Sequence, residues 1–168
     1  MATVAIADID ERAHPGENPA DYVMRLAQAK AARVAEWFPG AVVLGADTIV
    51  VQDGRLLGKP KDRNDAFSMW QAMSGKSHQV LTAVAVVQGK EAECRLSSSE
   101  VVMARITPEA MDAYWKTGEP ADKAGGYAIQ GLAARWIREI HGSYSGIMGL
   151  PLFETAELLN RAGIHPSP

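Results

Sequence analysis

The chain has 168 residues, enough for one domain with its own hydrophobic core, and 47% of them are hydrophobic while 22% are charged. Its formal net charge is −3, which gives no electrostatic argument for a nucleic-acid partner or an anionic membrane surface. A single cysteine, Cys94, excludes an internal disulfide; with no signal-peptide pattern and no long apolar run, the sequence predicts a cytoplasmic protein without a membrane partner.

Apolar, β-branched and capping residues predict an alternation of strands and helices. Helix starts are the clearest signals, because Asn18 precedes Pro19 and Thr107 precedes Pro108, which places a side-chain cap before a proline at the first helical position. The predicted elements are, in chain order, a strand over 3–8, a helix over about 19–38, a strand buried on both faces over 41–46, a hairpin turning at 53–54, a helix from Asp62 to Gly75, two long strands over 77–106, a helix from Thr107 to Gly118, an irregular segment over 118–131, a strand over 134–140, a loop over 141–149 and a helix from Pro151 to about Ala162. No repeat or linker interrupts this pattern, so residues 1–168 are predicted to form a single α/β domain.

Polar residues beside glycines mark the loops at 8–18, at 45–48 with 58–61, and at 118–131 as candidate site segments, because ligand-binding loops of α/β proteins gather at one sheet edge. Asp47 directly follows an apolar run and is predicted to lie at the carboxyl end of a strand, as a metal ligand or general base. The alternative is a turn-forming aspartate that accepts a hydrogen bond from its own backbone. The acids of the segment "DIDE" (8–11) could share a divalent metal with Asp47 or form a solvated turn.

Two further segments carry candidate binding groups. Lys59 stands between Gly58 and Pro60, a stiff arrangement that could aim its ammonium at a phosphate, although the phosphate-loop pattern is not met and a solvated lysine is the alternative. In "DKAGGYAIQG" (122–131) the glycines permit close backbone approach, and Gln130 offers a donor and an acceptor for a base edge. A tight crossover turn is the alternative for this segment.

Seven blocks together resemble the Maf family of nucleoside triphosphate pyrophosphatases. They are "ADIDE" (7–11), "RLAQAKA" (25–31), "VLGADTIV" (43–50), "GKP" (58–60), "MSGKSHQVLTAVAV" (73–86), "EPADKAGGYAIQG" (119–131) and "GSYSGIMGLPL" (142–152). The resemblance implies a mixed, twisted sheet flanked by helices, with two lobes around a nucleotide cleft. It also implies hydrolysis of a nucleoside triphosphate to the monophosphate and pyrophosphate with a divalent cation, Mg²⁺ or Mn²⁺, and it favours a homodimer.

The resemblance also assigns roles to individual residues. Asp47 matches the family's proton acceptor. Asp47 and Glu11 are also the predicted metal ligands, because carboxylates suit a hard divalent cation. The positions that match the family's polar pocket are Glu11, Lys30, Lys59 and Lys123. Thr48 and Gln130 match the specificity positions of the subgroup that acts on dTTP and UTP.

The sequence departs from the family in one place. Family members carry a segment of the form S-x-S-P-R-R about two dozen residues before "ADIDE", whereas no "SPRR" occurs here and six residues precede Ala7. The chain is therefore predicted to be truncated at its N-terminus and to lack the family's first strand. A catalytically impaired nucleotide-binding or cell-division regulatory protein is one alternative function. A 7-methyl-GTP pyrophosphatase is another, disfavoured by Thr48 and Gln130.

Overall fold

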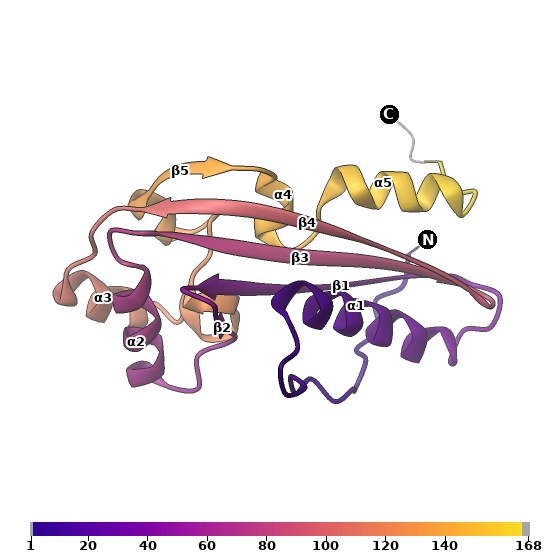
Figure 1. Ribbon diagram of the computed structural model, residues 1–168, viewed down its shortest axis with the longest axis horizontal. Helices are drawn as coiled ribbons and strands as arrows, with labels where there is room; N and C mark the ends of the chain where they lie inside the picture. Colours follow the sequence, from indigo (N-terminus) through magenta and orange to yellow (C-terminus); the bar gives the residue numbers. More distant parts are fainter. Residues whose placement is uncertain (1, 166–168) are drawn as a thin grey trace.

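The computed structural model describes residues 2–165, which form helices around one sheet (Figure 1). The elements are α1 (Pro19–Ala35), β1 (Val42–Gln52), β2 (Arg55–Leu57), α2 (Arg63–Met73), β3 (Ser77–Gln88), β4 (Glu91–Met103), α3 (Pro108–Trp115), three 3₁₀ turns η1 (Glu119–Asp122), η2 (Ala124–Gly126) and η3 (Leu132–Trp136), β5 (Ile137–His141), α4 (Tyr144–Met148) and α5 (Leu152–Arg161). The predicted α/β class with a helix-flanked sheet is confirmed.

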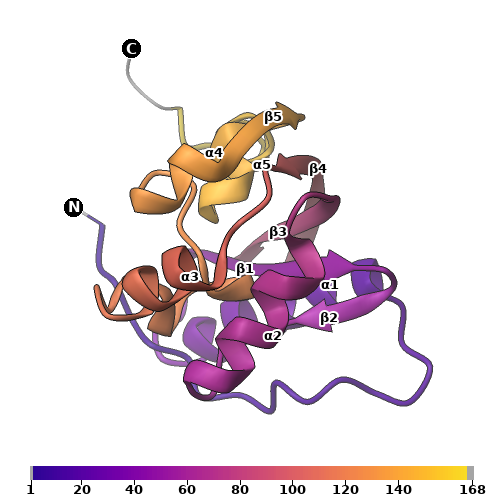
Figure 2. The ribbon, with the colours of Figure 1, turned by 90° about the vertical axis from the view of Figure 1, so that its left-hand side faces the viewer.

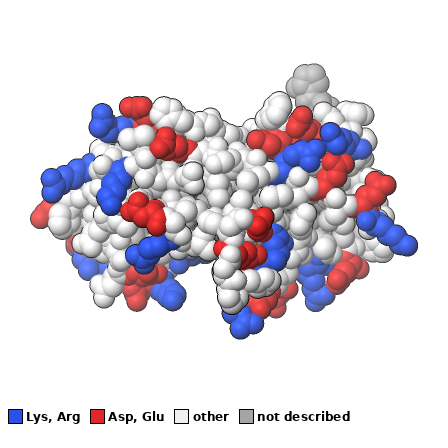
Figure 3. Space-filling model, in the orientation of Figure 1, with Lys and Arg blue, Asp and Glu red and all other residues white. Residues whose placement is uncertain are grey.

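The sheet has five strands in the order β2-β1-β3-β4-β5, and each of these neighbouring pairs is antiparallel. The β3–β4 hairpin runs the length of the molecule (Figure 1). Helices α1 and α5 lie at one end of this hairpin and α2 and α3 at the other (Figure 1), and the space-filling outline dips between the two ends along its upper edge (Figure 3). Charged side chains of both signs are interspersed over this face, as the small net charge predicts.

Helix α1 covers one face of β1 and β3, and Figure 2 shows α4, α5 and β5 on the opposite side of β3. Asn18 caps α1 through its side chain, which accepts from the Asp21 amide, and Pro19 is the first helical residue, as predicted. The helix comes unusually close to the sheet at Gly45. A Cβ at that position would lie 2.7 Å from the carbonyl oxygen of Ala27 and 2.8 Å from the amide nitrogen of Ala31, so only glycine fits.

At the other end, α2 and α3 pack with the turns η1 and η2 around a second core. Trp70 and Tyr114 are almost fully buried there, with ring centroids 5.4 Å apart. The Trp70 indole N–H donates to the Gly126 carbonyl at 3.0 Å, which joins α2 to the glycine-rich segment 118–131. Asp62 caps α2 and Thr107 caps α3, both as predicted.

Four sequence predictions are wrong in detail. The strand predicted over 134–140 begins only at Ile137, because the residues before it form the 3₁₀ turn η3. Residues 3–8 form no strand; Val4 and Ile6 are 94% and 89% exposed, so these β-branched residues have no neighbour to pack against. The strand predicted over 41–46 is the first half of the longer β1, and its Leu44 is 38% exposed rather than buried. The loop predicted over 141–149 contains the short helix α4, which Ser143 caps.

One long edge of β1 is open. Strand β3 pairs with β1 from Val42 to Val51, but β2 pairs on the other side through Val50, Val51 and Gln52 alone. Within residues 2–165, no strand pairs with β1 from Val42 to Ile49 on that side. A strand edge of this kind can present backbone groups and side chains from both faces to the same space.

Candidate active site

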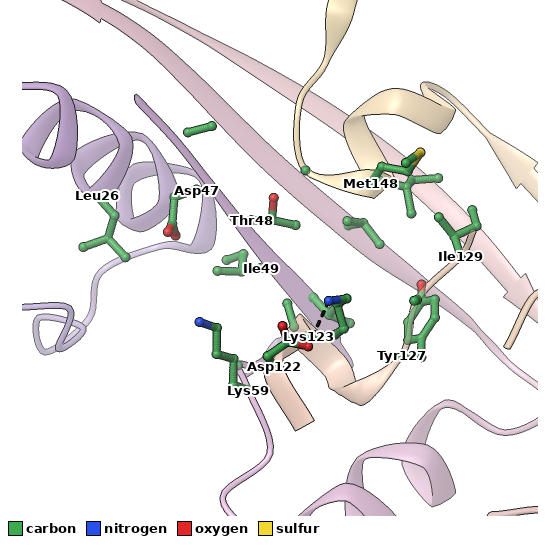
Figure 4. A pocket seen from close by; sticks show the side chains of 18 of the residues that line it. Leu26, Asp47, Thr48, Ile49, Lys59, Asp122, Lys123, Tyr127, Ile129 and Met148 are labelled. Atoms are coloured by element: carbon green, nitrogen blue, oxygen red, sulfur yellow. Dashed lines mark hydrogen bonds and ion pairs between the residues drawn. The ribbon is translucent and has the colours of Figure 1, made fainter. Parts of the chain in front are cut away.

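A cavity of about 380 Å³ lies against the open edge of β1, and Figure 4 shows it from close by. Its lining comprises Glu11, Tyr22, Leu26, Lys30, Ala46, Asp47, Thr48, Ile49, Val50, Gly58, Lys59, Val80, Asp122, Lys123, Ala124, Tyr127, Ala128, Ile129, Gln130, Ile147, Met148 and Gly149. Asp47 bonds to α1 on one face of the sheet and Thr48 to β3 next to α4 on the other. Both line the cavity because it extends around the strand edge.

Three charged side chains form one wall. The Lys30 ammonium, from α1, donates a short hydrogen bond to Asp47 Oδ1 and pairs with Glu11 Oε1 at 2.9 Å. Burial raises the pKa of the Asp47 carboxyl, and the opposing pull of Lys30 only partly offsets it. Burial by itself would lower the pKa of Lys30, but the bonds to both carboxylates outweigh it, so its pKa is raised. Asp47 is therefore a better proton acceptor than an exposed aspartate, next to a lysine that keeps its proton.

The segment that carries Glu11 is held against α1 although it has no regular structure. The Tyr22 hydroxyl donates to the Glu11 carbonyl at 2.8 Å. Arg25 donates to both carboxylate oxygens of Glu17, at 2.6 and 2.8 Å, and to the Arg12 carbonyl at 3.1 Å. These bonds place the Glu11 carboxylate at the mouth of the cavity.

The opposite wall carries two more lysines. Lys59 follows β2, and its ammonium is close enough to Asp47 to favour the charged carboxylate. Lys123 pairs with Asp122 at 2.9 Å, as the dashed line in Figure 4 marks. A backbone bond of 3.0 Å from Gly125 N–H to the Gly58 carbonyl joins the two segments, so the main chain next to each lysine is held in place.

On the side of Thr48 away from Asp47, Figure 4 shows Tyr127, Ile129 and Met148 as lining residues that are mostly apolar. Gln130 also lines the cavity and is exposed. The segment 128–132 is held by the Glu119 carboxylate, which accepts from the Leu132 amide at 3.1 and 3.2 Å and forms a short hydrogen bond with the Tyr114 hydroxyl. That hydroxyl in turn accepts from the Ala128 amide at 3.2 Å. The backbone on both sides of Gln130 is thereby anchored.

All seven candidate residues from the sequence line this one cavity: Glu11, Lys30, Asp47, Thr48, Lys59, Lys123 and Gln130. Two details of the prediction are wrong. Asp47 lies in the middle of β1 rather than at its carboxyl end, and segment 45–48 is strand rather than loop. Asp10 does not share a site with Asp47, because both of its oxygens bond Arg12 at 2.6–3.1 Å.

Sequence reasoning missed the cavity roles of Tyr22 and Leu26. A signal was present, because Tyr22, Leu26 and Lys30 are spaced four residues apart and so share one face of α1. Tyr127 was also missed as a wall residue. Its hydroxyl lies 2.7 Å from Nε2 of the buried His78, which sits behind the cavity as a structural residue.

Within residues 2–165, no group of three or more histidine, cysteine, aspartate or glutamate side chains is placed to hold a metal ion by itself. Asp47 and Glu11 remain as two carboxylates directed at the same point, where the Lys30 ammonium lies between them. In the same range, no helix is long and apolar enough to cross a membrane.

The fold and the cavity define an α/β protein with a small-molecule site at a sheet edge, where carboxylates and lysines are enclosed together. The chain belongs to the Maf-like protein family, whose family model matches residues 1–162. A relative from Bordetella avium, named dTTP/UTP pyrophosphatase, is 51% identical over 160 residues, covering 92% of this chain and 80% of the relative. Relatives of the same name from Aromatoleum aromaticum and Pseudoalteromonas atlantica are 50% and 45% identical; the alignments cover 94% and 96% of this chain and 79% and 86% of the relatives.

Proposed function

We propose that this protein hydrolyses dTTP, UTP and modified pyrimidine nucleoside triphosphates to the monophosphate and pyrophosphate. The observation that carries the proposal is the convergence of Asp47, Lys30 and Lys59 in one cavity of a chain about half identical to relatives named for this activity. Attack of water on the α-phosphorus forms one P–O bond and breaks the bond to the β-phosphate oxygen. The step needs an acceptor for the water proton and positive charge against the departing pyrophosphate.

Asp47 is the proposed proton acceptor. Its carboxylate is largely buried, and burial raises its pKa, which increases its affinity for a proton from water. Lys30 holds one of its oxygens, and this leaves the other oxygen of Asp47 to orient the attacking water.

The cations have a separate proposed role. Lys59 and Lys123 lie across the cavity from Asp47 (Figure 4), and a triphosphate chain would pass between them and Asp47. Lys123 would exchange its present partner Asp122 for a phosphate oxygen, whereas Lys59 would balance the charge that builds up on pyrophosphate.

The cavity also suits a divalent cation. Asp47 and Glu11 supply hard oxygen donors around a point already occupied by a positive ammonium, and Mg²⁺ typically takes one or two carboxylates with substrate phosphates as further ligands. We propose that these two residues hold Mg²⁺ or Mn²⁺, which would supply positive charge to the triphosphate and acidify bound water. The equal mixture of carboxylates and lysines in the cavity suits such a metal–triphosphate complex better than a bare anion.

Thr48 and Gln130 are the proposed base-reading residues, because they are hydrogen-bonding side chains that line the cavity together with the apolar Ile129, Ile147 and Met148. Ile129, Ile147 and Met148 would contact the base faces there. The resulting pyrimidine pocket explains the subgroup resemblance in physical terms.

The test measures pyrophosphate release from dTTP, UTP, CTP and 7-methyl-GTP in the presence of Mg²⁺. We expect release from dTTP and UTP, and a fall in kcat of about 10²–10⁴-fold in Asp47→Asn, which loses the proton acceptor. Asp53→Asn is the matched control, since Asp53 lies in the turn that follows the same strand, outside the cavity. Nucleotide binding without release from any substrate would replace the proposal by a binding or regulatory function. Release confined to 7-methyl-GTP would replace it by the other pyrophosphatase activity.

A further inference from the structure

A chain of two hydroxyl groups leads from the cavity into the sheet. Thr48 and Thr82 lie directly opposite each other on β1 and β3, with their Oγ1 atoms 2.8 Å apart. Thr82 Oγ1 lies 2.6 Å from the carbonyl oxygen of Gly146 in α4. Thr82 is fully buried and is not among the residues that line the cavity, whereas Thr48 is.

The proton order in this chain follows from hydrogen-bond inventory. A carbonyl oxygen cannot donate, so the proton between Thr82 and Gly146 belongs to Thr82. A hydroxyl has one proton, so Thr82 has none left for Thr48 and must accept from it. The Thr48 hydroxyl therefore donates its hydrogen bond to Thr82 and can act only as an acceptor toward a ligand.

The Thr48 oxygen has room for a ligand donor on its cavity side. Gly149 also lines the cavity, and a Cβ at that position would stand 3.5 Å from Thr48 Oγ1. Because Gly149 has no side chain, the space between Thr48 Oγ1 and the cavity is unobstructed on that side.

We propose that Thr82 is a positioning residue that fixes Thr48 as a hydrogen-bond acceptor and thereby selects the base. This inference rests on the proposed function and concerns the pyrimidine N3 position. Uracil and thymine carry an N3–H donor, which a Thr48 acceptor satisfies; cytosine has a lone pair at N3, which would face the lone pairs of Thr48. A site built to pair with a particular donor rejects an analogue that lacks it far more strongly than it rejects a change of size.

The experiment compares kcat/KM for UTP, CTP and 3-methyl-UTP in the wild type, Thr82→Val and Thr82→Ser. Valine keeps the branched shape and removes the hydroxyl, whereas serine keeps the hydroxyl. We expect the wild type to favour UTP over both analogues and Thr82→Ser to retain this preference. In Thr82→Val the hydroxyl of Thr48 is free to turn and donate, so kcat/KM should fall for UTP and rise for CTP, reducing the preference about tenfold, or about 1.4 kcal/mol.

Two further variants separate selection from general destabilisation. Thr155→Val is the matched control, because Thr155 is a buried threonine on α5 outside the cavity and should leave the preference unchanged. Thr82→Ala removes the same hydroxyl with no added methyl, and it replaces Thr82→Val if that variant does not fold. A loss of activity that is equal for UTP and CTP would indicate a merely structural role for Thr82.

The outcomes distinguish this inference from the proposed function. Turnover of UTP by the wild type, with a UTP preference unchanged by Thr82→Val, would overturn the inference and leave the function standing. A wild type that accepts CTP or 3-methyl-UTP as well as UTP would also overturn it. If the wild type turns over none of them, the function fails, and calorimetric titration of UTP and CTP into the same variants tests the base preference by dissociation constants.

Discussion

The close contact between α1 and β1 at Gly45 makes a quantitative prediction for Gly45→Ala. The added methyl would lie 2.7 Å from the Ala27 carbonyl oxygen and 2.8 Å from the Ala31 amide nitrogen of α1. These are backbone atoms, which cannot relieve the contact by a change of rotamer as a side chain can. Helix α1 would have to retreat by about half an ångström to restore ordinary contact. Overpacking of this kind costs about 1–3 kcal/mol, and the lower entropy of an unfolded chain with alanine returns about 0.4–1 kcal/mol.

The middle of each range, about 2 and about 0.7 kcal/mol, leaves an expected net loss of about 1.3 kcal/mol, which corresponds to a fall in Tm of about 3–5 °C for a domain of this size. Activity should fall as well, because Lys30 directly precedes Ala31 and would move away from Asp47 with the helix. We expect kcat/KM for UTP to fall by about tenfold, since small misplacements of catalytic groups have large effects.

Thermal unfolding and pyrophosphate release measure the two effects of Gly45→Ala. Gly58→Ala is the control for stability, because a Cβ there meets no heavy atom within 4 Å and the backbone is not left-handed. An unchanged Tm and an unchanged kcat/KM in Gly45→Ala would refute the packing argument. A lower Tm with full activity would instead show that the position of Lys30 does not matter for catalysis.

Three further predictions follow from buried polar contacts. Lys30→Met removes the cation that favours ionised Asp47, so the acid limb of the kcat/KM–pH profile should move to higher pH; an unmoved limb would exclude Asp47 as the titrating base. Burial lowers the pKa of His78 to about 4 from 6.5, so the unfolded chain binds the proton of this histidine more tightly than the folded protein does. The resulting contribution to stability, about 3 kcal/mol, is present above pH 6.5 and is lost as the pH falls towards 4. Denaturant unfolding of His78→Gln should show a flatter stability–pH curve, and an equally steep curve would contradict the assignment. Glu119 accepts hydrogen bonds from both the Tyr114 hydroxyl and the Leu132 amide, and glutamine has only one acceptor oxygen for these two donors. Glu119→Gln should therefore lose about 1–3 kcal/mol of unfolding free energy and show a higher KM for UTP. An unchanged KM would show that segment 128–132 does not need this hydrogen bond.

Helices and hairpins were predictable where their signals are local. Asn18, Asp62 and Thr107 bond to amides three residues ahead, so a short window of sequence contains the whole interaction. The turn at 53–54 is equally local, because Asp53 and Gly54 both adopt positive φ, as a two-residue hairpin requires.

Predictions failed where the deciding partner is distant in sequence. The β-branched residues at 3–8 would form a strand only beside another strand, and local sequence contains no information about that neighbour. Gly45 looked like the end of an apolar strand, whereas it is the point at which α1 approaches the sheet. Glycine within a strand pattern often marks such an approach, so this signal was available.

The same error explains the misplaced Asp47. With the strand predicted to end at Ala46, the aspartate would belong to a loop, and the direction of a loop side chain is not fixed by a strand's alternation. In β1, successive side chains must point to opposite faces, and this would separate Asp47 from Thr48 in the interior of a sheet. Only a strand with an open edge allows both neighbours to serve one cavity, and β1 has such an edge from Val42 to Ile49 within residues 2–165.

The open edge therefore connects the two halves of the proposed chemistry. On one face, Asp47 lies with Lys30 and Glu11, where a water and the α-phosphate would react; on the other, Thr48 lies with Thr82, where a base would be read. Adjacent Cα atoms are about 3.8 Å apart, so base recognition and proton transfer are joined by a single peptide unit of β1. A ligand seated correctly against Thr48 is for that reason also held in register with Asp47, and a base that shifts at Thr48 carries its α-phosphate away from the proton acceptor.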